Sequence, residues 1–80
     1  MVTEKVKQFL SWSNSTSRSI KKCIIEDAPL KEREIKILVL RYVIGKQVKE
    51  VAEELNIETD ALVKAQKKAI DKFYTYYFNN

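Results

Sequence analysis

Apolar residues recur every three or four positions through most of this chain, which is the spacing of one face of an α-helix. The clearest series follows Pro29 and forms one broad apolar face: Ile35, Ile37, Leu38, Leu40, Tyr42 and Ile44. Gly45, the only glycine, stands where a residue in the left-handed conformation would end this helix. The pattern predicts a helix from soon after Pro29 to about residue 44.

Two weaker apolar series precede Pro29. The first consists of Val2, Val6, Phe9 and Leu10, and Thr3 is a suitable N-cap for a helix that carries it. The polar run Ser11–Ser17 lowers helix propensity, so we expect a break or bend near Asn14. The second series is Ile20, Cys23 and Ile24, and it ends before Pro29, which disfavours helical geometry in the preceding residue. Two helices fit this segment, and so does one bent helix.

The C-terminal part of the sequence predicts two helices joined by a tight turn. A short helix covers about Val48–Leu55, and a long helix covers about Thr59–Tyr77, with Thr59 as its N-cap. Asn56 suits the turn because asparagine tolerates a positive φ, and Ala52 is small enough for a close crossing. Apolar residues on both sides could hold the crossing: Val48, Val51, Leu55, Ile57, Leu62 and Ala65. The sequence therefore predicts an all-α bundle of four to five helices containing a helix-turn-helix.

Composition narrows the possible functions. The chain has 80 residues, one cysteine and no histidine, so thiolate and imidazole metal sites and Ser-His-Asp or Cys-His catalysis lack their parts. We expect no enzyme activity, no metal and no cofactor. Cys23 is interpreted as a buried, reduced thiol. No apolar run is long enough to cross a bilayer and the N-terminus does not resemble a signal peptide, so we expect a cytoplasmic protein with no membrane partner.

Charge and aromatic residues point to partners. The formal net charge is +4, which suits a polyanion, and four lysines on the long helix form a basic cluster: Lys64, Lys67, Lys68 and Lys72. The same cluster would also suit an ordinary solvated helix face. Toward the C-terminus, Phe73 and Tyr77 continue the core face, whereas Tyr74 and Phe78 lie off it and could contact a second copy of the chain or another protein.

Three stretches of the sequence resemble region four of bacterial sigma factors. They are LKEREIKILVLRY (30–42) followed by Gly45, VKEVAEELNI (48–57), and KAIDKF (68–73). The resemblance implies a helical domain that binds an upstream promoter element, docks on RNA polymerase and has a bacterial or phage origin. Response regulators of the LuxR type share a similar module. On this basis residues 29–80 form the sigma region four-like domain, and residues 1–28 form a helical segment of open role that covers the bundle, dimerises it or binds polymerase.

The resemblance assigns roles to individual residues. Base-facing positions on the second helix of the motif are Thr59, Asp60, Val63 and Lys64. Positions at or near the phosphates are Arg33, Arg41, Val48, Lys49 and Lys68, to which we add Gln47 and Lys67. Physically, lysine can donate to guanine, aspartate can accept from the cytosine amino group, threonine can bond either way, and valine can meet the thymine methyl group.

Two functions follow as hypotheses. The first is a small DNA-binding transcriptional regulator that holds residues 59–77 in the major groove of double-stranded DNA; 80 residues leave no room for the other domains of a complete sigma factor. RNA polymerase and a second copy of the chain are further candidate partners. The alternative is an interaction module that does not bind DNA and docks on polymerase or another regulator. Glu58 and Asp60 favour the alternative, because they bring negative charge to the surface that DNA would approach.

Overall fold

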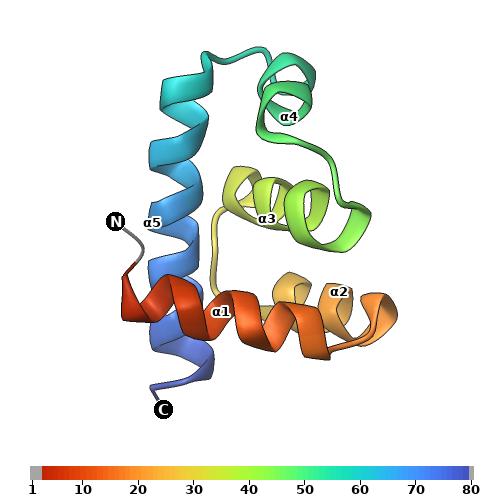
Figure 1. Cartoon of the computed structure of the whole chain (residues 1–80), viewed down its shortest axis with the longest axis vertical. Coiled ribbons are helices and arrows are strands. Elements are labelled where there is room, and N and C mark those ends of the chain that lie inside the picture. The colour runs from red at the N-terminus through yellow and green to blue at the C-terminus, as the bar shows by residue number, and fades with distance from the viewer. Residues whose placement is uncertain (1–2, 80) are drawn as a thin grey trace.

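In the computed structural model, which describes residues 3–79, the chain folds into five α-helices and one π-helical segment (Figure 1). The elements in chain order are α1 (Glu4–Ser15), α2 (Arg18–Asp27), α3 (Glu32–Leu38), the π-helical segment η1 (Val39–Ile44), α4 (Val48–Glu54) and α5 (Thr59–Tyr77). No strand occurs in this part of the chain. The all-α fold expected from the sequence is confirmed.

Hydroxyl side chains begin the first two helices. Thr3 Oγ1 accepts a hydrogen bond from Val6 N at 3.3 Å, which confirms the predicted cap of α1. Ser17 Oγ accepts from Ile20 N at 3.4 Å and caps α2 in the same way. The polar run between them therefore separates two helices, as one of the two alternatives expected. Val2, which the apolar series included, lies outside the described residues.

The helix after Pro29 changes its winding partway along. It is α-helical to Leu38 and continues as η1, in which Gly45 N donates to Leu40 O, five residues earlier, at 3.1 Å. The wider turn moves the inward face by about one residue: Val43 is 8% exposed and Ile44 is 53% exposed. The prediction that Ile44 lies on the apolar face was therefore wrong. Gly45 ends the segment at φ 92°, the left-handed conformation expected of it.

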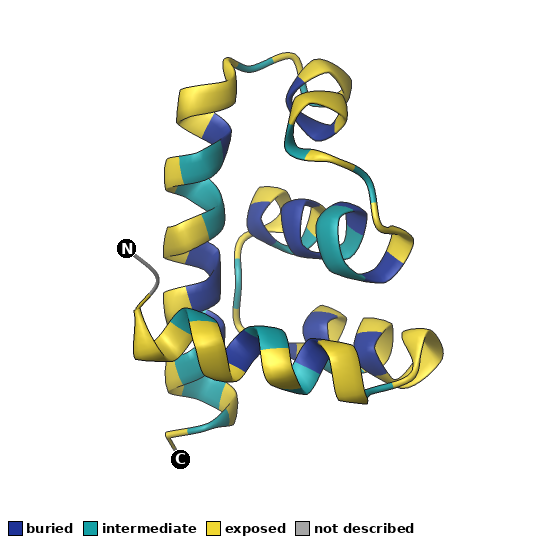
Figure 2. Ribbon diagram, in the orientation of Figure 1, coloured by how far each residue is buried: buried dark blue, intermediate teal, exposed yellow. Residues whose placement is uncertain are grey.

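The buried residues form two clusters (Figure 2). The larger one joins α1 and α2 to α3, η1 and the C-terminal half of α5: Phe9, Ile25, Ala28, Leu38, Val43, Ala69, Ile70 and Phe73. The smaller one joins α3 and η1 to α4 and the start of α5: Ile37, Leu40, Val51, Ala52 and Leu62. The two N-terminal helices thus share a core with the second half of α5, whereas the first half of α5 is held by α4 and the α3–η1 helix.

The buried face of α2 is not the one that the sequence pattern indicated. Lys21, Ile25 and Ala28 are buried, while Ile20 and Cys23 are exposed. Lys21 fits inside because its ammonium donates to Ser13 O at 3.0 Å and Ser13 Oγ at 3.1 Å, at the C-terminal end of α1. Burial, and then the nearby Arg18 charge, lower the pKa of Lys21 below its usual range. The prediction that Cys23 is a buried thiol was wrong.

The aromatic residues near the C-terminus pack around Trp12. Phe73 is fully buried as expected, but Tyr77 is 40% exposed and Phe78 is half-buried. The helix ends at Tyr77, where Phe78 N and Asn79 N both donate to Tyr74 O and the chain turns. Phe78 then lies with its ring centroid 6.1 Å from that of Trp12. The sequence pattern predicted that Tyr77 is on the core face and Phe78 is off it. This prediction was wrong, because the helix ends at Tyr77 and the chain turns Phe78 toward Trp12.

Candidate nucleic-acid interface

The turn between α4 and α5 is held by backbone hydrogen bonds and by one residue with a positive φ. Asn56 has φ 58°, as its place in the turn predicted. Ile57 N donates to Ala52 O at 3.0 Å, which brings the chain back over the end of α4. Ala52 and Leu62 are both buried beneath the turn, which fits a close crossing of the two helices. The scaffold of the predicted helix-turn-helix is present.

The start of α5 differs from the expectation in one respect. Glu58, not Thr59, is the N-cap residue, and its side chain makes no capping hydrogen bond. Thr59 is the first residue inside the helix, so the prediction that it serves as the cap was wrong. Asp60 does lie in the first turn, where a carboxylate interacts favourably with the positive end of the helix dipole.

The four predicted base-facing residues lie in the first two turns of α5. Thr59, Asp60 and Lys64 are exposed, and Val63 is half-buried. Positions three and four apart share one side of a helix, so Asp60, Val63, Lys64 and Lys67 follow one another along a single side. Leu62, between them in sequence, points into the core and is fully buried. The structure therefore places Asp60 and Lys64 on the outward side of α5, whereas Val63 lies at the edge of its buried side, in line with the buried Ile70.

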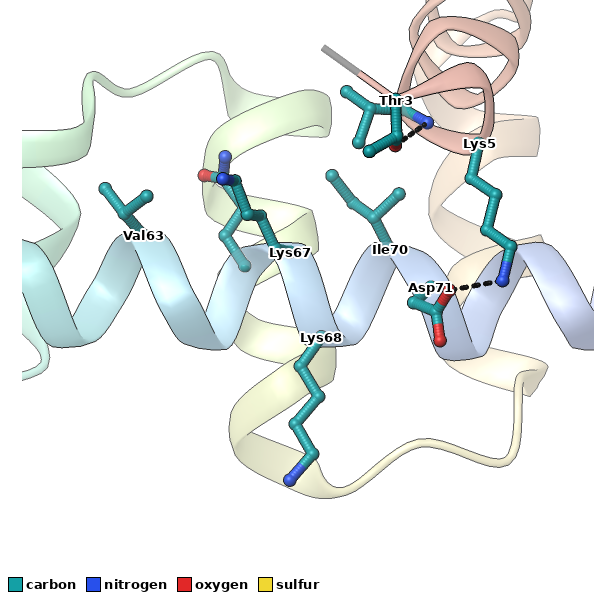
Figure 3. Close-up of a pocket in the computed structure, with 9 residues that line it drawn as sticks. Thr3, Lys5, Val63, Lys67, Lys68, Ile70 and Asp71 are labelled. Atoms are coloured by element: carbon teal, nitrogen blue, oxygen red, sulfur yellow. Dashed lines mark hydrogen bonds and ion pairs between the residues drawn. The ribbon is translucent and has the colours of Figure 1, made fainter. Parts of the chain in front are cut away.

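The lysines of the predicted basic cluster fall into two groups. Among the described residues, Lys64, Lys67 and Lys68 have no hydrogen-bond or ion-pair partner. Lys72 instead pairs with the buried Glu34, with 3.0 Å between Nζ and Oε2. Lys68 points to the opposite side of α5 from Val63 and Ile70 (Figure 3). The first three lysines are thus available to an external anion, while Lys72 holds α5 to α3.

The predicted phosphate-contacting residues outside α5 lie in different surroundings. Arg41 is half-buried and its guanidinium is used inside the protein, where Nε donates to Gln66 Oε1 at 2.8 Å and Nη1 donates to Lys46 O at 2.7 Å. Arg33 is exposed and lines a shallow hollow with Leu55, next to the turn. Arg41 therefore positions the loop before α4, and Arg33 keeps a free position beside the turn.

Two of the three residues at the start of α4, Gln47 and Lys49, are exposed. Gln47 is its exposed N-cap residue, and the backbone N–H of Gln47 donates to the Glu50 carboxylate at 3.0 Å, as in a capping box. Val48 is half-buried against the smaller core cluster. Lys49, in the first turn, has no hydrogen-bond or ion-pair partner within residues 3–79. This end of α4 offers one cation and one amide to an approaching partner.

Acidic side chains border the same surface. Glu53, Glu58 and Asp60 are exposed, and none of them forms an ion pair with another described residue. Glu54 is paired with Lys46, and the hydrogen bond and charge of Glu54 raise the pKa of Lys46. The surface therefore has unpaired lysines along α5 and unpaired carboxylates at the α4–α5 turn, so a polyanion would be held along the helix and repelled at the turn.

Three structural arrangements at or near this surface were not apparent from the sequence. They are the Arg41–Gln66 hydrogen bond, the Glu34–Lys72 pair, and a groove between α1 and α5 that contains Lys67. Each arrangement joins residues that are far apart in the chain, so the spacing of residues in the sequence does not predict it. Within the described residues, no cluster of histidine, cysteine or acidic side chains could hold a metal ion, and no helix is long and apolar enough to span a membrane.

No protein-family model, no curated protein and no solved structure matches the chain.

Proposed function

We propose that the chain is a small DNA-binding transcriptional regulator that inserts the first half of α5 into the major groove, as the resemblance to sigma region four suggests. The observation that carries this proposal is the set of unpaired lysines, Lys64, Lys67 and Lys68, on the exposed side of α5. A transcriptional role would place the protein with the DNA in the cytoplasm. RNA polymerase is a natural second partner for such a regulator.

The shape of the molecule supports this mode of binding. α5 has 19 residues, which makes it about 28 Å long, and the major groove, about 12 Å wide, admits one helix. α1 packs across the C-terminal half of α5, where Lys5 Nζ lies 2.6 Å from Asp71 Oδ1. The opposite end of α5, near α4, extends away from α1 and α2 (Figure 1). This end carries Thr59, Asp60 and Lys64, whereas Val63 and Lys67 lie nearer to the start of α1.

The side chains on this end could read bases as well as bind phosphates. Lys64 is a donor for guanine, Asp60 is an acceptor for the cytosine amino group, and the Val63 methyl groups suit the thymine methyl. Arg33, Gln47, Lys49, Lys67 and Lys68 would then contact the backbone. Arg41 would act indirectly, because its hydrogen bonds to Gln66 and to Lys46 O hold the start of the motif against α5.

A second candidate function is an interaction module that does not bind DNA. The unpaired Glu53, Glu58 and Asp60 favour it, since phosphates would be repelled from the turn that they border. A basic patch on a partner protein would complement this turn. DNA binding would use the unpaired lysines of α5, whereas the interaction module would use the unpaired carboxylates at the turn.

Selection of bound sequences from a random duplex pool tests the proposal. The purified chain would be incubated with the pool at two salt concentrations, and the bound fraction sequenced. We expect one enriched motif that persists at the higher salt, because base contacts survive when the phosphate contribution is weakened. Absence of any enrichment at either salt would overturn the proposal and leave the interaction module.

A charge-matched pair of variants locates the binding surface. Lys64→Glu with Lys68→Glu lowers the net charge from +4 by two units per substitution, to zero, on α5. Arg18→Glu with Lys22→Glu makes the same change of charge at exposed positions of α2, on another side of the molecule (Figure 1). We expect the α5 pair to abolish binding to the selected duplex and the α2 pair to weaken it by less than about tenfold. Equal losses would show that α5 is not the contact surface.

A further inference from the structure

A groove with a volume of about 400 Å³ lies between the start of α1 and the middle of α5 (Figure 3). Val6 contributes to it from α1, and Val63 and Ile70 contribute from α5. In the close-up, Val63 and Ile70 point from α5 toward the side on which α1 begins. Known small-molecule sites occupy roughly 300–1,000 Å³ and are lined mainly by apolar groups with a few polar ones. The groove is in this range and has an apolar floor.

The charged groups at the groove favour an anion. Lys5 and Lys67 line it together with a single carboxylate, that of Asp71, while the ammonium of Lys68, a third lysine at its edge, points to the other side of α5. The Asp71 carboxylate is neutralised by Lys5, at 2.6 Å. Lys67 lies between Val63 and Ile70 on the same side of α5 and has no hydrogen-bond or ion-pair partner among the described residues. The lining thus has a positive balance, with a free ammonium group beside an apolar surface.

We propose that this groove binds an amphipathic organic anion, a carboxylate with a medium-length aliphatic body. The aliphatic body would lie on Val6, Val63 and Ile70, and the carboxylate would pair with Lys67. Because Val63 and Lys67 are also in the proposed DNA surface, an occupied groove would exclude DNA. This last consequence rests on the proposed function, whereas binding of the anion does not.

Decanoate is a suitable probe for the site in the absence of DNA. The chain, with labelled valine and isoleucine methyl groups, would be titrated with decanoate below its micelle concentration and followed by NMR. We expect saturable shifts of the Val6, Val63 and Ile70 methyl signals, while the exposed Ile20 and Ile44 stay unchanged. Shifts centred on Ile20 or Ile44, or none that saturate, would overturn the proposal.

Two comparisons separate the apolar and ionic contributions. Lys67→Glu should weaken decanoate binding at least tenfold, and Lys22→Glu, at an exposed position of α2, should leave it within twofold. Decanol, which lacks the charge, should bind the unmodified chain at least tenfold more weakly than decanoate. Equal binding of decanol and decanoate, or equal effects of the two variants, would show that Lys67 does not hold the carboxylate.

Competition with DNA is then measured separately, on the duplex motif selected as described above. Saturating decanoate should lower the affinity for this duplex at least tenfold. It should not do so for Val6→Asp, which places a negative charge in the groove at a residue of α1 outside the proposed DNA surface. Decanoate binding without any duplex binding would leave the groove in place and overturn the proposed function. Duplex binding that is unaffected by saturating decanoate would overturn the regulatory consequence alone.

Discussion

Arg41 and Gln66 are joined by a hydrogen bond of 2.8 Å between Nε and Oε1, which links η1 to the middle of α5. The same guanidinium donates through Nη1 to Lys46 O at 2.7 Å, in the loop that leads into α4. The guanidinium carbon of Arg41, Cζ, lies 5.2 Å from the centroid of the Tyr42 ring. One side chain therefore holds three segments of the helix-turn-helix region in a fixed relation.

Replacement of Arg41 by lysine should reveal this role. Lysine keeps the charge but not the planar arrangement of donors, so Arg41→Lys should lower the free energy of unfolding by about 1–2 kcal/mol. Urea denaturation measures the change. Arg33→Lys is the matched control, because Arg33 is exposed and should cost less than about 0.5 kcal/mol. Similar losses for both variants would show that the Arg41 hydrogen bonds contribute little.

The turn at Asn56 allows a second test. Its φ of 58° is costly for alanine, by roughly 1–2 kcal/mol, but not for glycine. We therefore expect Asn56→Ala to destabilise the fold and Asn56→Gly to be close to neutral, as judged from thermal unfolding followed by circular dichroism. If both substitutions had the same effect, the asparagine side chain, and not the backbone conformation, would be what the turn requires.

Glu34 should make the stability depend on pH. Burial raises the pKa of its carboxyl, but the hydrogen bond from Lys31 N, at 2.9 Å, and the interaction with Lys72 outweigh burial, so the pKa is below its ordinary value of 4.5. As the pH falls, the unfolded chain takes up this proton before the folded chain does. The stabilisation is therefore complete above about pH 4.5 and is lost as the pH falls through the folded-state pKa.

The measurement is urea denaturation at a series of pH values, roughly from neutral to pH 3. Glu34→Gln should be less stable than the unmodified chain at neutral pH and should lose less stability in acid. Glu32→Gln, at an exposed position of the same helix, should retain the original pH dependence. If Glu34→Gln lost as much stability in acid as the unmodified chain, the loss would come from other carboxylates.

The salt dependence of DNA binding provides a further prediction. If roughly four to six phosphates are contacted, the logarithm of the affinity should fall with the logarithm of the salt concentration at a slope near −4 to −5. Lys67→Ala should reduce the steepness by about one. Fluorescence anisotropy of a labelled duplex measures both slopes. A flat response to salt would count against phosphate contacts and favour the interaction module.

Most helix boundaries could be predicted from the sequence because short-range chemistry sets them. The Thr3 hydroxyl reaches a backbone N–H three residues away. Gly45 adopts a positive φ because it lacks a Cβ, and Asn56 does so because asparagine tolerates this conformation. The single proline and the serine-rich run end helices for similarly local reasons. The spacing of Ala52 and Leu62 around Asn56 likewise predicted a close crossing, and both residues are buried.

Which helix face is buried, and which charges stay free, was decided only when the helices packed. On α2 the ammonium of Lys21 reaches Ser13 at the end of α1, so Lys21 is buried and Cys23 is exposed, against the apolar pattern. The π-helical winding of η1 similarly buried Val43 in place of Ile44. The burial of Lys21 depends on a partner in another helix, and that of Val43 depends on π-helical winding. A regular 3.6-residue apolar pattern predicts neither.

The candidate site divides in the same way. The sequence placed Thr59, Asp60, Val63 and Lys64 on one helix, because helical spacing alone brings them together. It could not distinguish Lys72, which pairs with Glu34 38 residues away, from Lys64 and Lys67, which have no partner among the described residues. Charge pairing acts through space, and distances between residues far apart in the chain exist only in the folded structure.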